Sequence, residues 1–352
     1  MAVLGSNYLS LADWAKRQDP DGKIGDIAEL LSQTNEIFED MVWLEGNLPT
    51  GHRSTVRTGL PSGTWRQLYQ GVVPGKSTTA QIEDHCGSLE AYSIVDRNLA
   101  ELNGDIGKFR LSEDMAQMEG LSQQVATALF YGNAAVNQTQ FTGLSPRFNT
   151  VATASAQTAY NVIDCGGTAS SNTSIWIVGW GDRTCHGIFP KGSKAGLLHE
   201  DKGDTIPGYD GSYNRFEAYT SYFRWQAGLT VRDWRYVVRL ANVDVTSATL
   251  GLQNATPVDL YAQLAKAVIR MPTTSYEVSG ITKSDAPDGV MPAIRPVIYC
   301  NRTVRQYLDI QAMRNARTLL RLSEYAGKVV ADFRGIPIRV CDALVNTETR
   351  VV

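Results

Sequence analysis

The chain has 352 residues, of which 43% are hydrophobic and 20% are charged, and its formal net charge is −3. This composition is typical of a folded protein with room for two domains or one large irregular domain. No apolar run reaches the roughly 20 residues that a membrane-spanning helix requires, so the sequence excludes one. The slight acidity argues against broad binding to the phosphate backbone of nucleic acids.

Residues 1–46 have the character of an arm rather than a domain. Short helices are predicted over Ser10–Arg17 and Ile24–Phe38, on either side of a turn at Asp19–Gly22. Nine acidic and three basic residues give this arm a net charge of −6. Such a charge run usually forms a solvated face. The acids closest to the next segment are Glu36, Glu39 and Asp40.

Residues 47–88 are rich in Gly, Ser and Thr and contain no acid before Glu83. Strand patterns over Arg53–Arg57 and Thr64–Leu68, joined through Gly59–Gly63, predict a β-ribbon. A two-stranded ribbon with so few apolar residues is marginal alone, so we expect it to rest on another subunit. A flexible surface loop is the alternative. Before Glu83, four basic residues give the segment a charge of +4: Arg53, Arg57, Arg66 and Lys76.

Residues 107–133 carry the strongest helical pattern, after a predicted strand at Leu89–Val95. We expect a helix over Ser112–Tyr131, roughly 30 Å long, with Ser112 as its N-cap. Gly120 inside this helix predicts a bend or a close approach of another segment. Apolar residues recur at steps of three, four and seven and predict one buried face: Leu111, Met115, Met118, Val125 and Leu129.

Strands and helices then follow without a regular βαβ repeat. The apolar density of Ser174–Trp180 predicts a fully buried strand. Residues 191–215 are polar and Gly-rich and predict an exposed loop. Tyr219–Trp225 and Leu229–Leu240 predict two strands that turn at Gly228.

The last third of the chain begins with a helix capped by Thr256 and ended by Pro272, with apolar residues from Leu260 to Met271 facing inward. A strand at Pro296–Cys300 and a helix capped by Asn301 follow. The predicted final element is strand-like, spans Lys328–Leu344 and is broken at Gly335 and Pro337. Together these elements predict an α+β fold.

No catalytic or cofactor motif is present: the chain contains no GxGxxG, GxxxxGK[ST], GxSxG or HExxH. His85-Cys86 and Cys185-His186 have the ligand types of a zinc site, but adjacent residues on a strand point to opposite faces, which suits chelation poorly. We therefore expect no enzyme, no cofactor and no metal. The five cysteines form no CxxC pair and predict reduced, mostly buried thiols: Cys86, Cys165, Cys185, Cys300 and Cys341.

The order of these parts resembles the major capsid protein of tailed bacteriophages, whose shell fold is shared with herpesvirus capsid floors and bacterial encapsulins. Three short stretches resemble that family: Phe141–Leu144 (FTGL), Pro296–Asn301 (PVIYCN) and Phe333–Ile338 (FRGIPI). The phrases GNLPTGHRSTVRTGLP, RLSEDMAQMEGL, LFYGN and HGIFPKGSKAG are similar to the subfamily found in short-tailed and related phages.

The resemblance implies a tailed-phage major capsid fold with named parts. These are an N-terminal arm (1–46), an extended β-ribbon called the E-loop (47–88), a peripheral domain (89–149) with a spine helix (112–131), an axial domain with surface insertions (150–325) and a strand returning to the peripheral domain (326–352).

The implied function is structural. Copies would self-assemble into hexamers and pentamers of an icosahedral head that encloses double-stranded DNA without reading its sequence. The protein would be made in the host bacterial cytoplasm and located in the virion, without membrane association. A separate scaffolding protein, a portal protein and a decoration protein are the implied partners. An encapsulin-like compartment that packages cargo enzymes is the alternative, and a carbohydrate-active enzyme, suggested only by the tryptophans, is a distant one.

The charge contrast between arm and ribbon predicts where subunits meet. Opposite fields on separate elements steer association and fix which surfaces pair. We expect the ribbon's Arg53, Arg57, Trp65 and Arg66 to contact an adjacent subunit. The expected partners there are the acids Glu36, Glu39 and Asp40.

Overall fold

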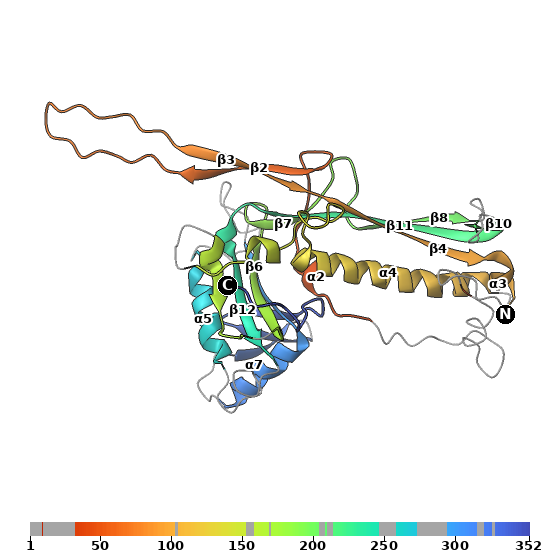
Figure 1. The fold of residues 1–352 in the computed structure, drawn as a ribbon. Helices are drawn as coiled ribbons and strands as arrows, with labels where there is room; N and C mark the ends of the chain where they lie inside the picture. Colours follow the sequence, from red (N-terminus) through yellow and green to blue (C-terminus); the bar gives the residue numbers. More distant parts are fainter. Residues whose placement is uncertain are drawn as a thin grey trace. The chain divides into compact units, whose positions relative to one another are not determined.

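The computed structural model describes residue 9 and residues 32–102, 105–152, 158–168, 170–203, 208–209, 214–245, 258–272, 294–314, 320–325 and 328–352. Helices and strands are mixed, as predicted, and the chain divides into two compact units (Figure 1). The smaller contains residues 88–127 and 196–226 and the larger residues 35–87, 128–195 and 227–352. No helix in the described ranges is long and apolar enough to cross a membrane.

The larger unit is organised around strand β6, Asn172–Trp180, whose nine residues are all buried. The prediction of a fully buried strand is therefore confirmed. Two antiparallel neighbours flank it, β12 (Val237–Asp244) and β13 (Arg295–Cys300). Outward from β13 follow β16 (Ile336–Val340), β15 (Lys328–Phe333) and β14 (Leu320–Tyr325). The other strands that join are β5 (Val162–Asp164), β7 (Cys185–Phe189) and β1 (Trp43–Glu45).

Helices α5 (Leu260–Arg270) and α7 (Arg302–Arg314) lie beside this sheet and share its core (Figure 1). As predicted, Asn301 caps α7, because its side-chain oxygen accepts the Val304 N–H at 2.8 Å. The predicted cap of α5 lies outside the described residues, and the observed cap is Asp259, whose carboxylate accepts two N–H groups of the first turn. The described residues also form 3-10 turns: η1 (Ser145–Arg147), η2 (Thr158–Asn161) and η3 (Trp234–Tyr236).

In the smaller unit, β4 (Gly87–Asp96) and β8 (Leu197–Gly203) lie next to β11 (Ala218–Val231), and β8 pairs antiparallel with it. Thus residues 191–215 are not only loop, because they supply β8, β9 (Gly208–Tyr209) and the start of β10 (Arg215–Phe216). A core of Val95, Leu99, Ala100 and Phe109 joins this sheet to α3 (Arg97–Glu101) and α4 (Ile106–Tyr131).

Helix α4 begins six residues earlier than predicted, at Ile106 instead of Ser112. Asp105 supplies the cap, since its carboxylate accepts the Lys108 N–H at 3.0 Å. Ser112 lies inside the helix and donates its hydroxyl to the Phe109 carbonyl at 2.8 Å. A cap needs a residue just outside the first turn, and Asp105 fills that place.

The predicted apolar stripe of α4 is buried only in its second half. Leu121, Val125 and Leu129 are at most 3% exposed, whereas Leu111 and Met115 are 57% and 48% exposed. The buried face of the first turns runs through Phe109 instead, at 1%. The predicted close approach at Gly120 is absent, because a side chain there would meet no described atom within 4 Å.

Two predicted breaks are also wrong. Gly228 lies inside β11, where a Cβ would come within 2.9 Å of the Ile188 side chain, so it permits close strand packing rather than a turn. The chain turns instead between β11 and β12, at η3. Pro337 lies inside β16, and the break before it is at Arg334 and Gly335, whose φ values are +53° and +80°.

Strand β2 (Gly51–Gly59) pairs antiparallel with β3 (Thr78–His85) in the segment where the sequence predicts a ribbon. The predicted second strand at Thr64–Leu68 is wrong, because residues 60–77 contain no ladder and connect the two strands. Thr, Trp and Leu favour strands only when a neighbour packs on them, and residues 64–68 are all exposed.

Candidate interaction surfaces

The base of the ribbon is fixed by close packing and local hydrogen bonds. A Cβ at Gly51 would lie 2.0 Å from the Asp84 carbonyl oxygen, so only glycine fits there. The Asn47 side chain donates to the Arg53 carbonyl and accepts the Arg53 N–H, both at 2.7 Å. Across the ribbon, the Arg53 guanidinium donates to Glu83 at 2.7 Å and holds the pKa of that carboxyl below its usual range. Arg53 therefore already has an acidic partner in its own ribbon.

Arg147 joins the ribbon base to the rest of its unit. Its guanidinium donates to the buried Asp84 carboxylate of β3 at 2.8 Å, and to the carbonyls of Thr142 and Leu229 at 3.1 Å each. Its Nε also donates to the Gly143 carbonyl at 3.2 Å. A buried carboxylate is costly unless paired, so this arginine holds β3 in place. The stretch Phe141–Leu144, singled out in the sequence, supplies two of the four acceptors.

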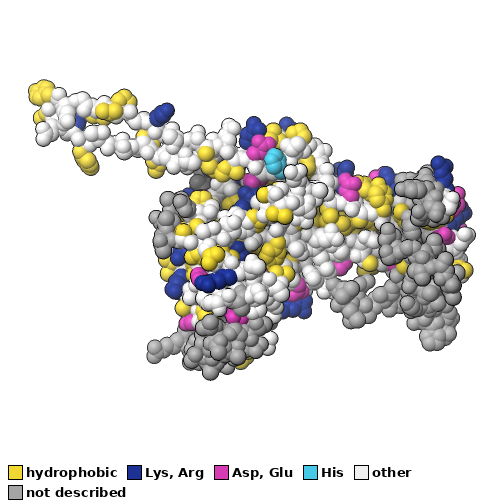
Figure 2. Space-filling model, in the orientation of Figure 1, with side chains coloured by type: hydrophobic (Ala, Val, Ile, Leu, Met, Phe, Trp, Pro, Cys, Tyr) yellow, Lys and Arg dark blue, Asp and Glu magenta, His cyan; other side chains and the backbone are white. Residues whose placement is uncertain are grey.

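The far end of the ribbon, residues 60–77, presents apolar side chains to solvent (Figure 2). Trp65 and Tyr69 are fully exposed, and Arg66 donates to the Gln70 carbonyl at 3.1 Å, within the same segment. Exposed apolar clusters of this kind mark interaction sites. The large hydrophobic side chains that are more than half exposed here are Leu60, Trp65, Leu68, Tyr69, Val72 and Val73.

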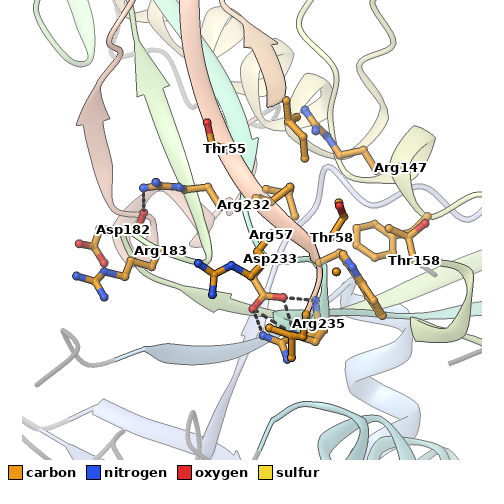
Figure 3. A pocket seen from close by; sticks show the side chains of 17 residues that line it. Thr55, Arg57, Thr58, Arg147, Thr158, Asp182, Arg183, Arg232, Asp233 and Arg235 are labelled. Carbon is orange, nitrogen blue, oxygen red and sulfur yellow. Dashed lines mark hydrogen bonds and ion pairs between the residues drawn. The ribbon is translucent and has the colours of Figure 1, made fainter. Parts of the chain in front are cut away.

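A groove of about 1120 Å³ lies between strand β2 of the ribbon and the η3 turn (Figure 3). Its charged lining consists of five arginines and two aspartates: Arg57, Arg147, Arg183, Arg232, Arg235, Asp182 and Asp233. Asp233 is bound by Arg235 at 2.6 Å, and Arg232 donates to the Asp182 carbonyl at 3.1 Å. Arg57 and Arg183 are exposed. Sequence reasoning found only Arg57 of this set, because the others come from turns far away in the chain.

The acids expected to meet the ribbon have a different partner within their own chain. Glu36 and Asp40 lie 3.3 and 3.4 Å from the Arg339 guanidinium on β16. Burial raises the pKa of Asp40, which Arg339 and the Tyr299 hydroxyl partly oppose. Glu39 is exposed. The structure thus brings Glu36 and Asp40 to β16 and leaves Glu39 facing solvent.

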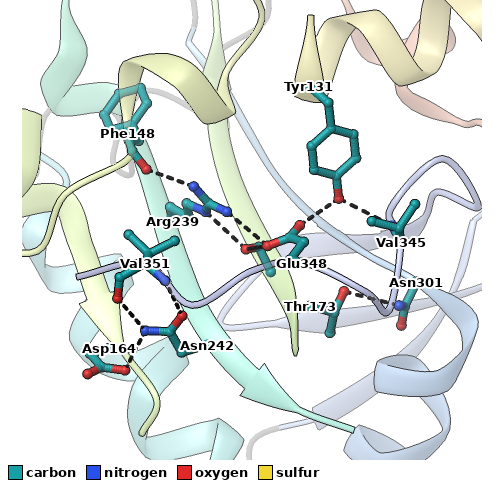
Figure 4. Close-up of polar contacts among 11 residues, drawn as sticks. Tyr131, Phe148, Asp164, Thr173, Arg239, Asn242, Asn301, Val345, Glu348 and Val351 are labelled. Carbon is teal, nitrogen blue, oxygen red and sulfur yellow. Dashed lines mark hydrogen bonds and ion pairs between the residues drawn. The ribbon is translucent and has the colours of Figure 1, made fainter. Parts of the chain in front are cut away.

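A buried ion pair that sequence reasoning missed fixes the C-terminal segment (Figure 4). The Glu348 carboxylate lies 2.8 Å from the Arg239 guanidinium and also accepts the hydroxyls of Ser174 and Tyr131. Burial is the main reason that the pKa of Tyr131 is raised. Arg239 and Glu348 are 109 residues apart in the chain, and no local sequence pattern predicts that they pair.

Next to it, Asn242 accepts the Val351 N–H and donates to the Val351 carbonyl, both at 2.8 Å. Its backbone adopts a φ of +58°, a conformation that Asn tolerates better than most residues. Together these contacts hold residues 348–351 against β6 and β12.

The two His-Cys pairs considered for zinc lie near the ribbon base. Cys185 is buried and His186 packs edge-on against His52, with ring centroids 5.7 Å apart. Burial, followed by the neighbouring His52 and Arg232, lowers the pKa of His186 to about 4. Within the described residues no three His, Cys, Asp or Glu side chains are placed to hold a metal ion.

All five cysteines are free thiols, and four of them are buried, as predicted. The tryptophans Trp176 and Trp180 are core residues at 0% exposure.

Comparison with known proteins identifies close relatives of this arrangement. The family model of major capsid protein GP7 matches residues 19–352. A chain from the structure of bacteriophage Epsilon15 is similar over 100% of this chain and 99% of its own length, with 31% identity and a TM-score of 0.72. No curated protein sequence matches.

Two further solved structures show weaker likeness. The bacteriophage JBD30 capsid has 13% identity and a TM-score of 0.49, over 90% of this chain and 93% of that one. A Synechococcus elongatus encapsulin has 12% identity and a TM-score of 0.38, over 68% and 98%. The likeness to the encapsulin is too weak to argue for a cargo compartment.

Proposed function

Because the chain belongs to the major capsid protein GP7 family and forms the shell of a phage, we propose that its copies assemble into the hexamers and pentamers of an icosahedral head around double-stranded DNA. The observation that carries this proposal is similarity along the whole chain to a phage structure at 31% identity. The role is structural, and the protein is located in the virion capsid. It is made in the host bacterial cytoplasm.

The ribbon makes the contact between neighbouring copies in this proposal. Its end exposes Trp65 and Tyr69, which no described residue of the same chain covers. Burying such apolar surface against a second copy stabilises the assembly by roughly 25 cal/mol per Å² before the costs of association. Arg53, Arg57 and Arg66 then meet acids of an adjacent copy, where Glu39 is exposed and Glu36 and Asp40 are shared with Arg339.

The parts of the chain take the following roles in this proposal. Residues 1–46 act as the arm, 47–88 as the E-loop, 89–149 with the spine helix as the peripheral domain, 150–325 as the axial domain and 326–352 as the return strand. Shell formation uses a separate scaffolding protein, a portal protein occupies one vertex and a decoration protein binds outside. The slight net negative charge of −3 suits a container that does not grip its DNA.

Charge reversal on the ribbon tests the contact. The variant carrying Arg57→Glu and Arg66→Glu changes two exposed side chains, so the subunit should fold with unchanged stability. We expect slowed or blocked shell formation in sedimentation velocity, partly restored by Glu39→Lys, because Glu39 is exposed whereas Glu36 and Asp40 pair with Arg339 of their own chain. Arg350→Glu, an exposed arginine outside the ribbon, is the matched control. Normal assembly of the double variant across a range of salt concentrations would refute the contact.

A further inference from the structure

Two histidines face each other where the base of the ribbon meets strand β7. His52 on β2 and the fully buried His186 on β7 meet edge to face, with ring centroids 5.7 Å apart and ring planes at 82°. Strands β2 and β3 form a sheet of their own, so among the described residues no backbone ladder joins β2 to β7. Side chains, rather than backbone hydrogen bonds, therefore hold these two strands together.

Buried polar atoms gather around this contact without hydrogen-bonding partners among the described residues. They include both ring nitrogens of His186 and the Nδ1 atom of His52. They also include the hydroxyl of Thr230, opposite His186 on β11, and one carboxylate oxygen of Asp84, opposite His52 on β3. Buried polar groups are almost always paired, so such a cluster is unusual. No hydrogen bond from these atoms opposes the separation of β2 from β7.

Burial keeps both rings neutral. It is the main reason that the pKa of each histidine is lowered, in His186 to about 4. The neighbouring thiols are uncharged as well, because burial raises the pKa of Cys86 to about 11 and that of Cys185 to about 12. The charged groups around the pair come from β3, from η1, from the turn before β7 and from the end of β11: Asp84, Arg147, Asp182 and Arg232.

These charges oppose a proton on either ring. Arg232 repels a proton on both histidines. Asp84 favours a proton on His52, but the Arg147 guanidinium already binds this carboxylate at 2.8 Å. Asp182 favours a proton on the other ring less strongly than Arg232 opposes it. A proton on either histidine thus places an uncompensated charge in the contact, and such a charge is costly when it is buried.

We propose that His52 and His186 form a proton-sensitive latch, which holds the ribbon base against β7 while both rings are neutral and releases it when they take up protons. Release exposes the imidazoles to water, where the pKa of histidine is near 6.5. The attached state binds fewer protons than the released state, so lowering the pH from about 6.5 toward 4 favours release. Release breaks no strand pairing within either sheet.

Backbone contacts next to the latch decide how the released ribbon moves. Just before β2, the Gly46 N–H donates to the Phe189 carbonyl at 2.8 Å, and the Lys191 N–H donates to the Leu48 carbonyl at 3.2 Å. These bonds keep the start of the ribbon at the end of β7, while the ion pair of Arg147 holds β3. The ribbon therefore tilts about its base when the latch opens.

The consequence for assembly rests on the shell-forming function proposed above. There the ribbon reaches an adjacent copy, so the latch makes that contact depend on pH. The latch itself belongs to a single chain and is tested on unassembled subunits. Its failure is therefore distinct from a failure to form shells.

Pulsed electron paramagnetic resonance measures the position of the ribbon in the unassembled subunit. Spin labels are attached to a ketone-bearing amino acid at the exposed positions of Thr79 on β3 and Asn149 after η1, so the natural cysteines stay unchanged. We expect one distance at pH 7.5 and a second, additional distance at pH 5.5. The ratio of the second population to the first should rise by about tenfold to a hundredfold, because each histidine contributes up to about tenfold over this range.

Histidine variants assign the response to this pair. The double variant His52→Phe and His186→Phe keeps two rings in contact and should show the same ratio at both pH values. His52→Gln changes only the half-buried ring and should show a smaller rise than the natural protein, which decides the matter should the double variant not fold. His85→Gln, at an exposed position on β3, is the matched control and should respond as the natural protein does.

Three results would overturn the latch. The distances could be the same at pH 7.5 and pH 5.5 in the natural protein. The histidine variants could respond as fully as the natural protein, which would assign the effect to carboxylates such as Asp84. The far-ultraviolet circular dichroism signal could be lost together with the change in distance, which would mean that the unit unfolds rather than that the ribbon is released.

Discussion

At the scale of single residues, Glu348 connects three parts of the larger unit. It is 7% exposed, and its partners are Arg239 on β12, Ser174 on β6 and the Tyr131 hydroxyl at the end of α4. Arg239 also donates to the Phe148 carbonyl and lies over the Trp176 ring. These side chains satisfy one another's hydrogen-bonding groups. Removing the charge of Glu348 or Arg239 would therefore leave the other charge buried and unpaired.

Glu348→Gln should therefore destabilise the unassembled subunit by about 3 to 5 kcal/mol, because it leaves the Arg239 guanidinium without its counter-charge. Urea unfolding of the purified subunit measures this change. Glu217→Gln, at an exposed position, is the matched control and should shift the free energy of unfolding by less than about 0.5 kcal/mol. Equal stability of the two variants would mean that the ion pair contributes nothing.

His186 makes the stability of the fold depend on pH. Its pKa is lowered to about 4 by burial, His52 and Arg232, while an unfolded histidine titrates near 6.5. Between these values the unfolded chain binds a proton that the folded chain does not, so stability present above pH 6.5 is lost as pH falls toward 4. The loss attributable to this residue is about 3 kcal/mol over the whole window.

His186→Gln removes that titration. Unfolding free energies measured from pH 7 to pH 5 should fall less steeply in this variant than in the natural protein, whatever its stability at pH 7. The same slope in both would show that His186 is protonated equally in the folded and unfolded states.

At the scale of elements, the ribbon combines an anchored base with an exposed end. Arg147 and Gly51 fix the base, whereas the end presents Trp65, Leu68 and Tyr69 to solvent. A two-stranded ribbon is only marginally stable alone. The packing at its base therefore fixes the direction in which the ribbon extends.

Trp65→Ala should leave the stability of the free subunit within about 0.5 kcal/mol of the natural protein, since the side chain is fully exposed. It should nevertheless raise the protein concentration needed for assembly, because the apolar surface that a neighbour would bury is lost. Light scattering during assembly measures that concentration. Met313→Ala, also exposed at 85%, is the control and should have no effect; an equal effect of both would argue against a contact at the ribbon end.

The elements also show how far sequence reasoning reaches. Strand β6 and the cap of α7 were predictable, because continuous burial and an Asn before a helix are local signals. Strand propensity places the second ribbon strand at Thr64–Leu68 instead of Thr78–His85, because the length of the connection between the two strands is not a local signal. The exposed Leu111 and Met115 follow the same helical period as buried residues, so periodicity alone could not tell them apart. The Arg239–Glu348 ion pair and the arginine-lined groove bring together residues that are far apart in the chain, so no local sequence signal predicts them.

At the scale of the whole molecule, membership of a capsid family explains features that a monomer would not need. Among the described residues, the ribbon's end exposes Trp65, Leu68 and Tyr69, and the groove exposes Arg57 and Arg183. Single exposed ion pairs are worth only about 0–1 kcal/mol, and charges farther apart than roughly 10 Å are largely screened at 0.1 M salt. Repeated over many equivalent contacts in a shell, such small terms decide whether assembly proceeds.

Electron microscopy of the purified protein, expressed together with the scaffolding protein that we propose, tests the central claim most directly. We expect closed icosahedral shells of uniform size, whose reconstruction shows hexamers and pentamers with each ribbon crossing onto an adjacent copy. A protein that stays monomeric at assembly concentrations with the scaffolding protein supplied would contradict the account.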